Sequence, residues 1–173
     1  MPNETLEQFH DMVQDLEVAM FTTRRPDGML VSRPMATQAR AEGADLWFVT
    51  ERRSSKVEEI RFDPNVNLAY YKDRTREWIS VAGHARLVDN RAKIRELYRP
   101  DWRAWFGDEG GKKDGGPGDP RMILIAVEVQ VAHFMELNKP QAVVLFEVVR
   151  GMLTGKQPDF PDVKEVTARS SDE

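Results

Sequence analysis

Hydrophobic side chains first recur at helical spacing and then alternate every second residue. In Thr5–Leu16 the apolar positions lie three or four residues apart with acidic residues between them, which predicts an amphipathic helix. Val18–Thr23 and Met29–Thr37 read as strands, and the Pro-Asp-Gly sequence at residues 26–28 is typical of a hairpin turn. Pro34 places the second strand at a sheet edge or at a bulge.

The alternation continues through the middle of the chain. Asp45–Thr50, Val66–Lys72 and Glu77–Val88 are predicted as strands, with a helix at Ser55–Arg61 between the first two. Gly83 interrupts the longest strand, which indicates a β-bulge or a close approach of another backbone segment. These segments favour a sheet of half-buried strands.

The next part of the chain carries one more helix and the most apolar strand. Helix signals run from Asp89 or Asn90 to Tyr98. Met122–Val129 is the most apolar strand, and Val131–Leu137 either extends it or pairs with it. The total is six or seven strands with short helices and no strand-helix-strand rhythm, which predicts a mainly β protein built as a closed or partly closed antiparallel barrel.

Three further segments are irregular or ambiguous. Residues 107–118 are rich in glycine but lack the preceding strand and the spacing of a phosphate-binding loop, so a flexible loop is expected. Ala142–Met152 fits a strand or a helix. The residues after Pro158 are polar and predict a frayed tail. We therefore expect a single domain at residues 1–155 and a polar tail at residues 156–173.

Composition narrows the class of protein. A chain of 173 residues with 40% hydrophobic content suits one soluble domain. No apolar run approaches the roughly 20 residues that span a bilayer, and the N-terminus has no signal-peptide pattern. A cytoplasmic protein without a membrane segment is expected.

Charge and cysteine content exclude several chemistries. The chain has no cysteine, which excludes disulfides, thiolate catalysis and iron–sulfur clusters. Its net charge of -4 argues against nucleic-acid binding. His10, His84 and His133 are far apart in sequence and belong to no ligand pair, so no metal site is expected.

One polar cluster lies where a predicted strand passes into a helix. Its members are Thr50, Arg52, Arg53, Ser54, Ser55 and Lys56. Hydroxyl donors and an ammonium group at a helix N-terminus suit a bound phosphate. Ser55 followed three residues later by Glu58 is also the pattern of an ordinary capping box. Spacing alone leaves both interpretations open.

No constellation of acid–base residues accompanies this cluster. Glu58 and Glu59 are interpreted as the solvated face of a short helix, and no serine lies in a nucleophile elbow. Strand alternation places Arg33, Met35 and Thr37 on one face. A phosphate site without its own acid–base machinery indicates that a bound cofactor supplies the chemistry.

Several short sequence motifs occur along the chain in an order that resembles a known family. They are Asp27-Gly28, Ser32-Arg33-Pro34-Met35, Trp47-Phe48-Val49-Thr50, Ser54-Ser55-Lys56, Ser80-Val81-Ala82-Gly83, Trp102, Trp105-Phe106, Asp119-Pro120 and the apolar strand from Leu124 to Val127. Over roughly Leu6 to Gly155 the chain resembles flavin-binding split barrels of the general stress protein 26 type, which are related to pyridoxamine 5′-phosphate oxidase.

The resemblance implies a six-stranded antiparallel split β-barrel that binds FMN in a cleft between the two subunits of a homodimer. Carried over by position, it assigns the phosphate to Thr50, Ser54, Ser55 and Lys56. It assigns the flavin ring to Arg33, Pro34, Met35 and Thr37. It also brings Trp102 and Trp105 near the cleft, from the partner subunit.

The implied activity is transfer of electrons or hydride from NADH or NADPH through FMN to a small acceptor. Ser55 stands where the oxidase carries arginine, and the oxidase's C-terminal substrate motif has no counterpart, so pyridoxamine phosphate oxidation is not expected. Two alternatives remain: a non-catalytic flavin-binding stress protein that sequesters or senses the cofactor, and a β-barrel interaction module with an ordinary helix cap.

Overall fold

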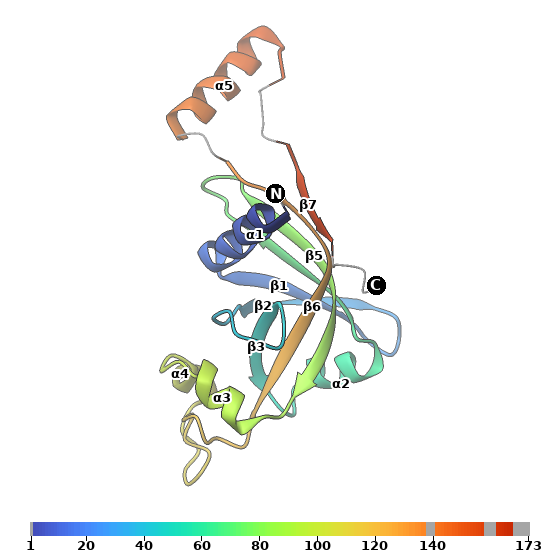
Figure 1. Cartoon of the computed structure of the whole chain (residues 1–173), viewed down its shortest axis with the longest axis vertical. Coiled ribbons are helices and arrows are strands. Elements are labelled where there is room, and N and C mark those ends of the chain that lie inside the picture. The colour runs from blue at the N-terminus through green and yellow to red at the C-terminus, as the bar shows by residue number, and fades with distance from the viewer. Residues whose placement is uncertain (1, 138–140, 158–161, 168–173) are drawn as a thin grey trace.

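The chain forms an antiparallel sheet rolled into a barrel that stays open along one side (Figure 1). The computed structural model describes residues 2–137, 141–157 and 162–167. Six strands run in the order β2-β1-β4-β5-β6-β3. Their bounds are β1 Val18–Arg24, β2 Leu30–Ala36, β3 Leu46–Glu51, β4 Asn65–Tyr71, β5 Trp78–Val88 and β6 Met122–Met135. The mainly β fold class expected from the sequence is confirmed.

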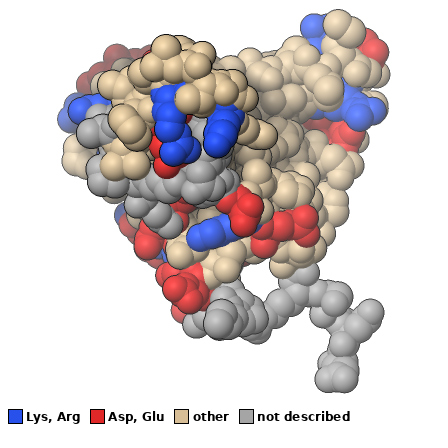
Figure 2. All heavy atoms as spheres, turned by 90° about the horizontal axis from the view of Figure 1, so that it is seen from above, with Lys and Arg blue, Asp and Glu red and all other residues tan. Residues whose placement is uncertain are grey.

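Five helices accompany the described strands. They are α1 Pro2–Leu16, α2 Ser55–Phe62, α3 Arg91–Leu97, α4 Trp102–Phe106 and α5 Gln141–Thr154. The ambiguous segment near residue 142 is thus a helix, and α5 stands away from the barrel (Figure 1). Seen from above, the end of the molecule that carries α5 presents mainly uncharged side chains (Figure 2).

Part of the polar C-terminal segment pairs with the sheet rather than fraying. Lys164–Thr167 forms β7, a seventh strand antiparallel to the C-terminal half of β6. Val131–Leu137, which was expected either to extend the apolar strand or to pair with it, extends it as part of one long β6. β3 and β7 occupy successive halves of the β6 edge that faces away from β5. Residues 158–161 and 168–173 of the predicted tail lie outside the described residues.

Two hydrophobic clusters hold the barrel together. The main cluster fills the interior with side chains of α1 and the strands, including Phe9, Phe21, Phe48, Leu68 and Phe134. A second cluster lies outside β3 and β6, where Ile94 and Leu97 of α3 and Trp102 of α4 cover Trp47, Met122 and Leu124. Strand β3 is therefore buried on both faces, which fixes α3 and α4 beside it.

The glycine within β5 marks the bulge that the sequence predicts. The register between β5 and β6 shifts between Ala82 and Gly83. A Cβ atom at Gly83 would lie 2.6 Å from the carbonyl oxygen of Glu128, so another backbone does approach closely here. Any larger residue would have to displace main-chain atoms of β6.

The two free edges of the sheet, β2 and β3, leave the barrel split. Just beyond β2, the Gln38 N–H donates to the carbonyl oxygen of Trp47 at 2.8 Å, but the strands themselves make no ladder with each other. Pro34 lies in this edge strand, as expected, where its missing N–H costs no ladder bond. The split creates a gap that side chains of β2 and β3 line.

Candidate functional site

A pocket of about 1000 Å³ opens at the split between β2 and β3. Its walls come from both edge strands, the turn into α2, α4, and the loop that follows α4. The lining residues are Val18, Arg33, Pro34, Met35, Ala36, Gln38, Val49, Thr50, Glu51, Arg52, Arg53, Lys56, Asp101, Trp102, Trp105, Phe106, Glu109, Lys113, Pro120 and Arg121. This volume is at the upper end for small-molecule sites and suits a nucleotide-sized ligand.

Seven of the ten residues chosen from the sequence line this pocket. They are Arg33, Pro34, Met35, Thr50, Lys56, Trp102 and Trp105. Ser54 lies beside them, with its hydroxyl 3.3 Å from the Thr50 hydroxyl, and Ser55 is exposed at the helix start. Thr37 is buried outside the pocket, where its hydroxyl pairs with the Tyr70 hydroxyl at 2.8 Å.

The capping box predicted at Ser55 and Glu58 does not form. Helix α2 begins at Ser55, so the N-cap residue is Ser54, and the Ser54 side chain makes no capping hydrogen bond. The helix begins one residue earlier than the box requires, so Ser55 lies in the first turn instead of at the cap, and the Ser54 hydroxyl is turned to the Thr50 hydroxyl. Among the described residues, no acceptor is bound to the backbone N–H groups of Ser55 and Lys56. The helix start therefore keeps donors available for a ligand.

Two cations at this helix start have no carboxylate partner. The Lys56 ammonium donates to the Thr50 hydroxyl at 3.0 Å, and within the described chain no carboxylate lies within ion-pair distance of it. Burial, together with the nearby Arg33 guanidinium, lowers the pKa of Lys56. The exposed Arg53 guanidinium likewise has no ion pair with any described residue, whereas Arg52 is paired with Asp89 at 2.8 Å. This arrangement attracts an anion.

Arg33 borders the pocket with its charge already neutralised. Its guanidinium lies 2.7 Å from a Glu59 carboxylate oxygen and donates to the Thr23 hydroxyl at 2.5 Å. Glu59 is only 6% exposed, so the expectation of a solvated glutamate face was wrong for this residue. Burial opposes ionisation of Glu59, but hydrogen bonds from Thr23 and Arg33 outweigh it and lower the pKa.

The two tryptophans of α4 take different positions. Trp102 is buried, and its indole N–H donates to the Gln38 side-chain oxygen at 2.9 Å. Trp105, one turn later, is 86% exposed at the pocket. Trp102 thus fixes the pocket wall, while Trp105 leaves a large aromatic face available for contact.

The end of the glycine-rich loop is tied to α4 by a buried ion pair. Asp119 is fully buried and accepts hydrogen bonds from the N–H groups of Gly115 and Arg121, each at 2.9 Å. The Arg121 guanidinium binds Asp119 at 2.7 Å and donates to the Phe106 carbonyl at 2.8 Å. Sequence reasoning missed this pair as part of the site. The Asp-Pro-Arg sequence after the glycines was the available signal.

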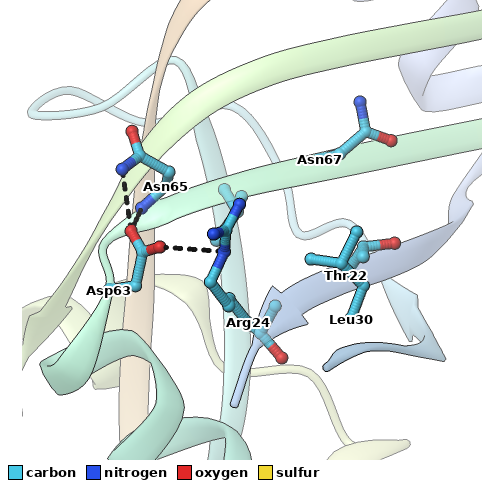
Figure 3. Close-up of a pocket in the computed structure, with 8 residues that line it drawn as sticks. Thr22, Arg24, Leu30, Asp63, Asn65 and Asn67 are labelled. Atoms are coloured by element: carbon cyan, nitrogen blue, oxygen red, sulfur yellow. Dashed lines mark hydrogen bonds and ion pairs between the residues drawn. The ribbon is translucent and has the colours of Figure 1, made fainter. Parts of the chain in front are cut away.

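A second cavity, of about 370 Å³, is lined by residues of β1 and β4, by Leu30 at the start of β2 and by Asp63 after α2 (Figure 3). Its arginine, Arg24, is already paired with Asp63 at 3.4 Å, and Asp63 also accepts from the Asn65 side chain at 2.7 Å. Because its charges compensate one another, this cavity lacks the anion preference of the larger pocket.

Among the residues that line the large pocket there is no histidine or cysteine. The described part of the chain holds no group of three metal-ligating side chains. It also holds no helix long and apolar enough to cross a membrane. The charged groups that line the pocket are carboxylates, lysines and arginines, which can bind, orient and polarise a ligand.

Comparisons with known proteins agree with this geometry. A family model described as pyridoxamine 5′-phosphate oxidase like matches residues 4–159. Protein bli-3 of Neurospora crassa is 37% identical over 152 residues, which cover 86% of this chain and 73% of that protein.

Solved structures share the fold. A crystal structure assigned to general stress protein 26 from Jannaschia sp. CCS1 has a TM-score of 0.73 at 22% identity, covering 95% of this chain and 99% of that one. A general stress FMN/FAD binding protein from Xanthomonas citri has a TM-score of 0.63 at 23% identity, covering 80% of this chain and 92% of that one. The open antiparallel sheet is thus a split barrel of this type.

Proposed function

This chain belongs to the pyridoxamine 5′-phosphate oxidase like family, and we propose that it binds FMN in the pocket between β2 and β3. The observation that carries the proposal is a pair of cations, Lys56 and Arg53, that line the pocket at the start of α2 and form no ion pair with any described residue. A phosphate placed there would meet both cations and the free N–H groups of the helix start. The flavin-binding relative from Xanthomonas citri supports the same ligand class.

The pocket divides the proposed ligand contacts between two walls. Thr50, Ser54, Ser55, Lys56 and Arg53 would hold the phosphate. Arg33, Pro34 and Met35 would lie along the flavin ring, with Trp105 as an exposed aromatic face and Trp102 behind it. Thr37 would act indirectly, because its bond to Tyr70 fixes the end of β2.

Bound FMN would supply electron or hydride transfer between a reduced nicotinamide and a small acceptor. The contribution of this chain is to hold the ring in the split, to keep water from its inner side with Met35 and Val49, and to place the Arg33–Glu59 ion pair nearby. Pyridoxamine phosphate oxidation is not part of the proposal, since Ser55 replaces the arginine of the oxidase pattern. A cytoplasmic location belongs to the same proposal.

The proposal includes a homodimer. Trp105 is 86% exposed at the pocket, Val18 in the same pocket lining is 47% exposed, and Met20, two residues along β1 from Val18, is 44% exposed. Large apolar side chains gathered on an exposed surface mark regions that another protein covers. A second copy over this region would close the open side of the pocket.

Removing the two free cations is expected to weaken FMN binding about 100-fold and riboflavin binding less than threefold. Each charge-assisted contact to phosphate contributes about 1.5–3 kcal/mol, and riboflavin has no phosphate. The measurement is a fluorescence-quenching titration of Arg53→Ala/Lys56→Ala with both flavins. Arg61→Ala, at the other end of α2, is the matched control and should bind both flavins normally. Equal losses for FMN and riboflavin would contradict the proposed phosphate site.

Anaerobic mixing with NADH or NADPH separates an enzyme from a cofactor-storing stress protein. If the chain is a reductase, the flavin-loaded protein should lose its visible absorption within seconds on mixing with one of the two donors, faster than free FMN at the same concentration. A rate equal to that of free FMN would favour the non-catalytic alternative. If the protein binds no added FMN, both the reductase and the cofactor-storing protein are ruled out.

A further inference from the structure

Helix α5 stands at the tip of an arm that extends beyond the barrel (Figure 1). It lies in the connection between β6 and β7, which pair antiparallel at the base of the arm. Its most exposed apolar side chains are Leu145 (66%), Phe146 (65%), Val149 (45%), Met152 (80%) and Leu153 (82%). These positions are spaced one, four, seven and eight residues from the first, so they form one stripe along the helix, the α5 stripe.

The α5 stripe needs a partner for physical reasons. A helix of 14 residues is marginal in water unless an apolar face packs against something. Monomeric proteins rarely expose a contiguous apolar surface of this kind. The helix carries few charges, and the end of the molecule that bears it is mainly uncharged (Figure 2).

The same chain offers a second apolar surface that no described residue covers. On the outer side of the sheet, Val18, Met20, Pro34, Ala36, Ala69 and Tyr71 are exposed and uncharged; these six form the outer face. The strand register makes them neighbours, since Met20 lies opposite both Pro34 and Ala69, and Val18 lies opposite Ala36. Val18, Pro34 and Ala36 also line the large pocket. A segment that covers the outer face therefore borders the pocket mouth.

We propose that α5 is an exchanged arm, with the α5 stripe of each copy packed on the outer face of the partner subunit. The inference rests on the homodimer of the proposed function and specifies how that dimer is built. Two-fold symmetry lets each chain give one surface and receive the other, so both apolar surfaces are covered at once. A lipid surface is a poorer match, because interfacial helices are rich in lysine and arginine, whereas α5 contains one arginine.

Disulfide trapping tests the contact directly, because the chain contains no cysteine. Met20→Cys is combined in turn with Leu145→Cys, Val149→Cys or Met152→Cys, and the proteins are oxidised. At least one double variant should form a covalent dimer on a non-reducing gel, while each single variant stays monomeric. Dimers of a single α5 variant would mean that the helices pair with each other. Dimers of Met20→Cys alone would mean that the outer faces meet. Either of these two results would overturn the proposal. A disulfide within one chain, or no disulfide in any double variant, would overturn it as well.

Replacing two residues of the α5 stripe with serine tests how much the arm stabilises the dimer. Leu145→Ser/Met152→Ser should weaken dimerisation at least tenfold in sedimentation equilibrium, and Arg150→Ala on the same helix should not. If the serine variant dimerises as tightly as the wild type, the proposed exchanged arm is wrong, but the proposed FMN site is unaffected. If Arg53→Ala/Lys56→Ala binds FMN with normal affinity, the proposed FMN site is wrong, but the proposed arm is unaffected. Binding of the wild-type chain to phosphatidylcholine vesicles would assign the stripe to a lipid surface instead.

Discussion

Replacing Glu59 with glutamine is expected to lower the free energy of unfolding by about 3–5 kcal/mol, the cost of removing one member of a buried ion pair. The Glu59 and Arg33 side chains are 8% and 21% exposed, so water can compensate the lost charge only in part. The measurement is urea unfolding at pH 7 with linear extrapolation. The effect should be large because Glu59 joins three elements: α2, β2 through Arg33, and β1 through Thr23.

Two variants show whether charge pairing is the cause. Glu58→Gln, one residue away on the exposed side of α2, should change stability by less than about 0.5 kcal/mol. The double variant Arg33→Met/Glu59→Leu should be more stable than Glu59→Gln, because no unpaired charge remains buried. A loss in Glu59→Gln below about 1 kcal/mol, or no recovery in the double variant, would count against this account.

Replacing Asp119 with asparagine is expected to cost about 3–5 kcal/mol at pH 7 for the same reason. Asp119 is fully buried and its partner Arg121 has a side chain only 10% exposed. The change should also loosen the wall of the pocket, since Arg121 holds the Phe106 and Gly107 carbonyl groups. Asp108→Asn, which affects an exposed ion pair of the same loop, should cost less than about 1 kcal/mol.

The effect of Asp119 has a defined pH dependence. Burial opposes its ionisation, but hydrogen bonds from Arg121 and Gly115 outweigh burial and lower its pKa from 3.8 to about 2. A carboxylate with a lowered pKa stabilises the folded state fully above pH 3.8, and this contribution is lost as the pH falls through about 2. The stability difference between wild type and Asp119→Asn should therefore shrink as the pH falls from 4 to 2. A difference that stays constant over this range would show that Asp119 acts through shape alone.

Much of the fold followed from local pattern. Alternation identified the strands, Pro34 marked an edge strand, and Gly83 marked the bulge, because each depends on backbone geometry that one residue imposes. The strand-to-helix turn before Lys56 was found in the same way. Helix α5 stayed ambiguous, since valine-rich segments satisfy strand propensity and helix packing alike.

Contacts between distant segments could not be predicted. Glu59 looked like a solvated residue because its partner Arg33 is 26 positions away, and nothing in the local sequence reports that distance. The bond between Trp102 and Gln38 spans 64 positions, and β7 exists only because β6 is long enough to offer it an edge. The capping box at Ser55 and Glu58 did not form because the helix begins at Ser55 itself, so that Ser54 and not Ser55 is the N-cap residue.

By itself, the sequence determined an antiparallel barrel with a polar helix start after its third strand, because periodicity and helix-terminus chemistry are local properties. Only the tertiary structure decided which charges at that site are free. It paired Arg33 with Glu59 and Arg52 with Asp89, and it left Lys56 and Arg53 without carboxylate partners among the described residues. Whether a cation is neutralised depends on which side chains the fold brings within about 4 Å of it, and no spacing along the chain encodes that.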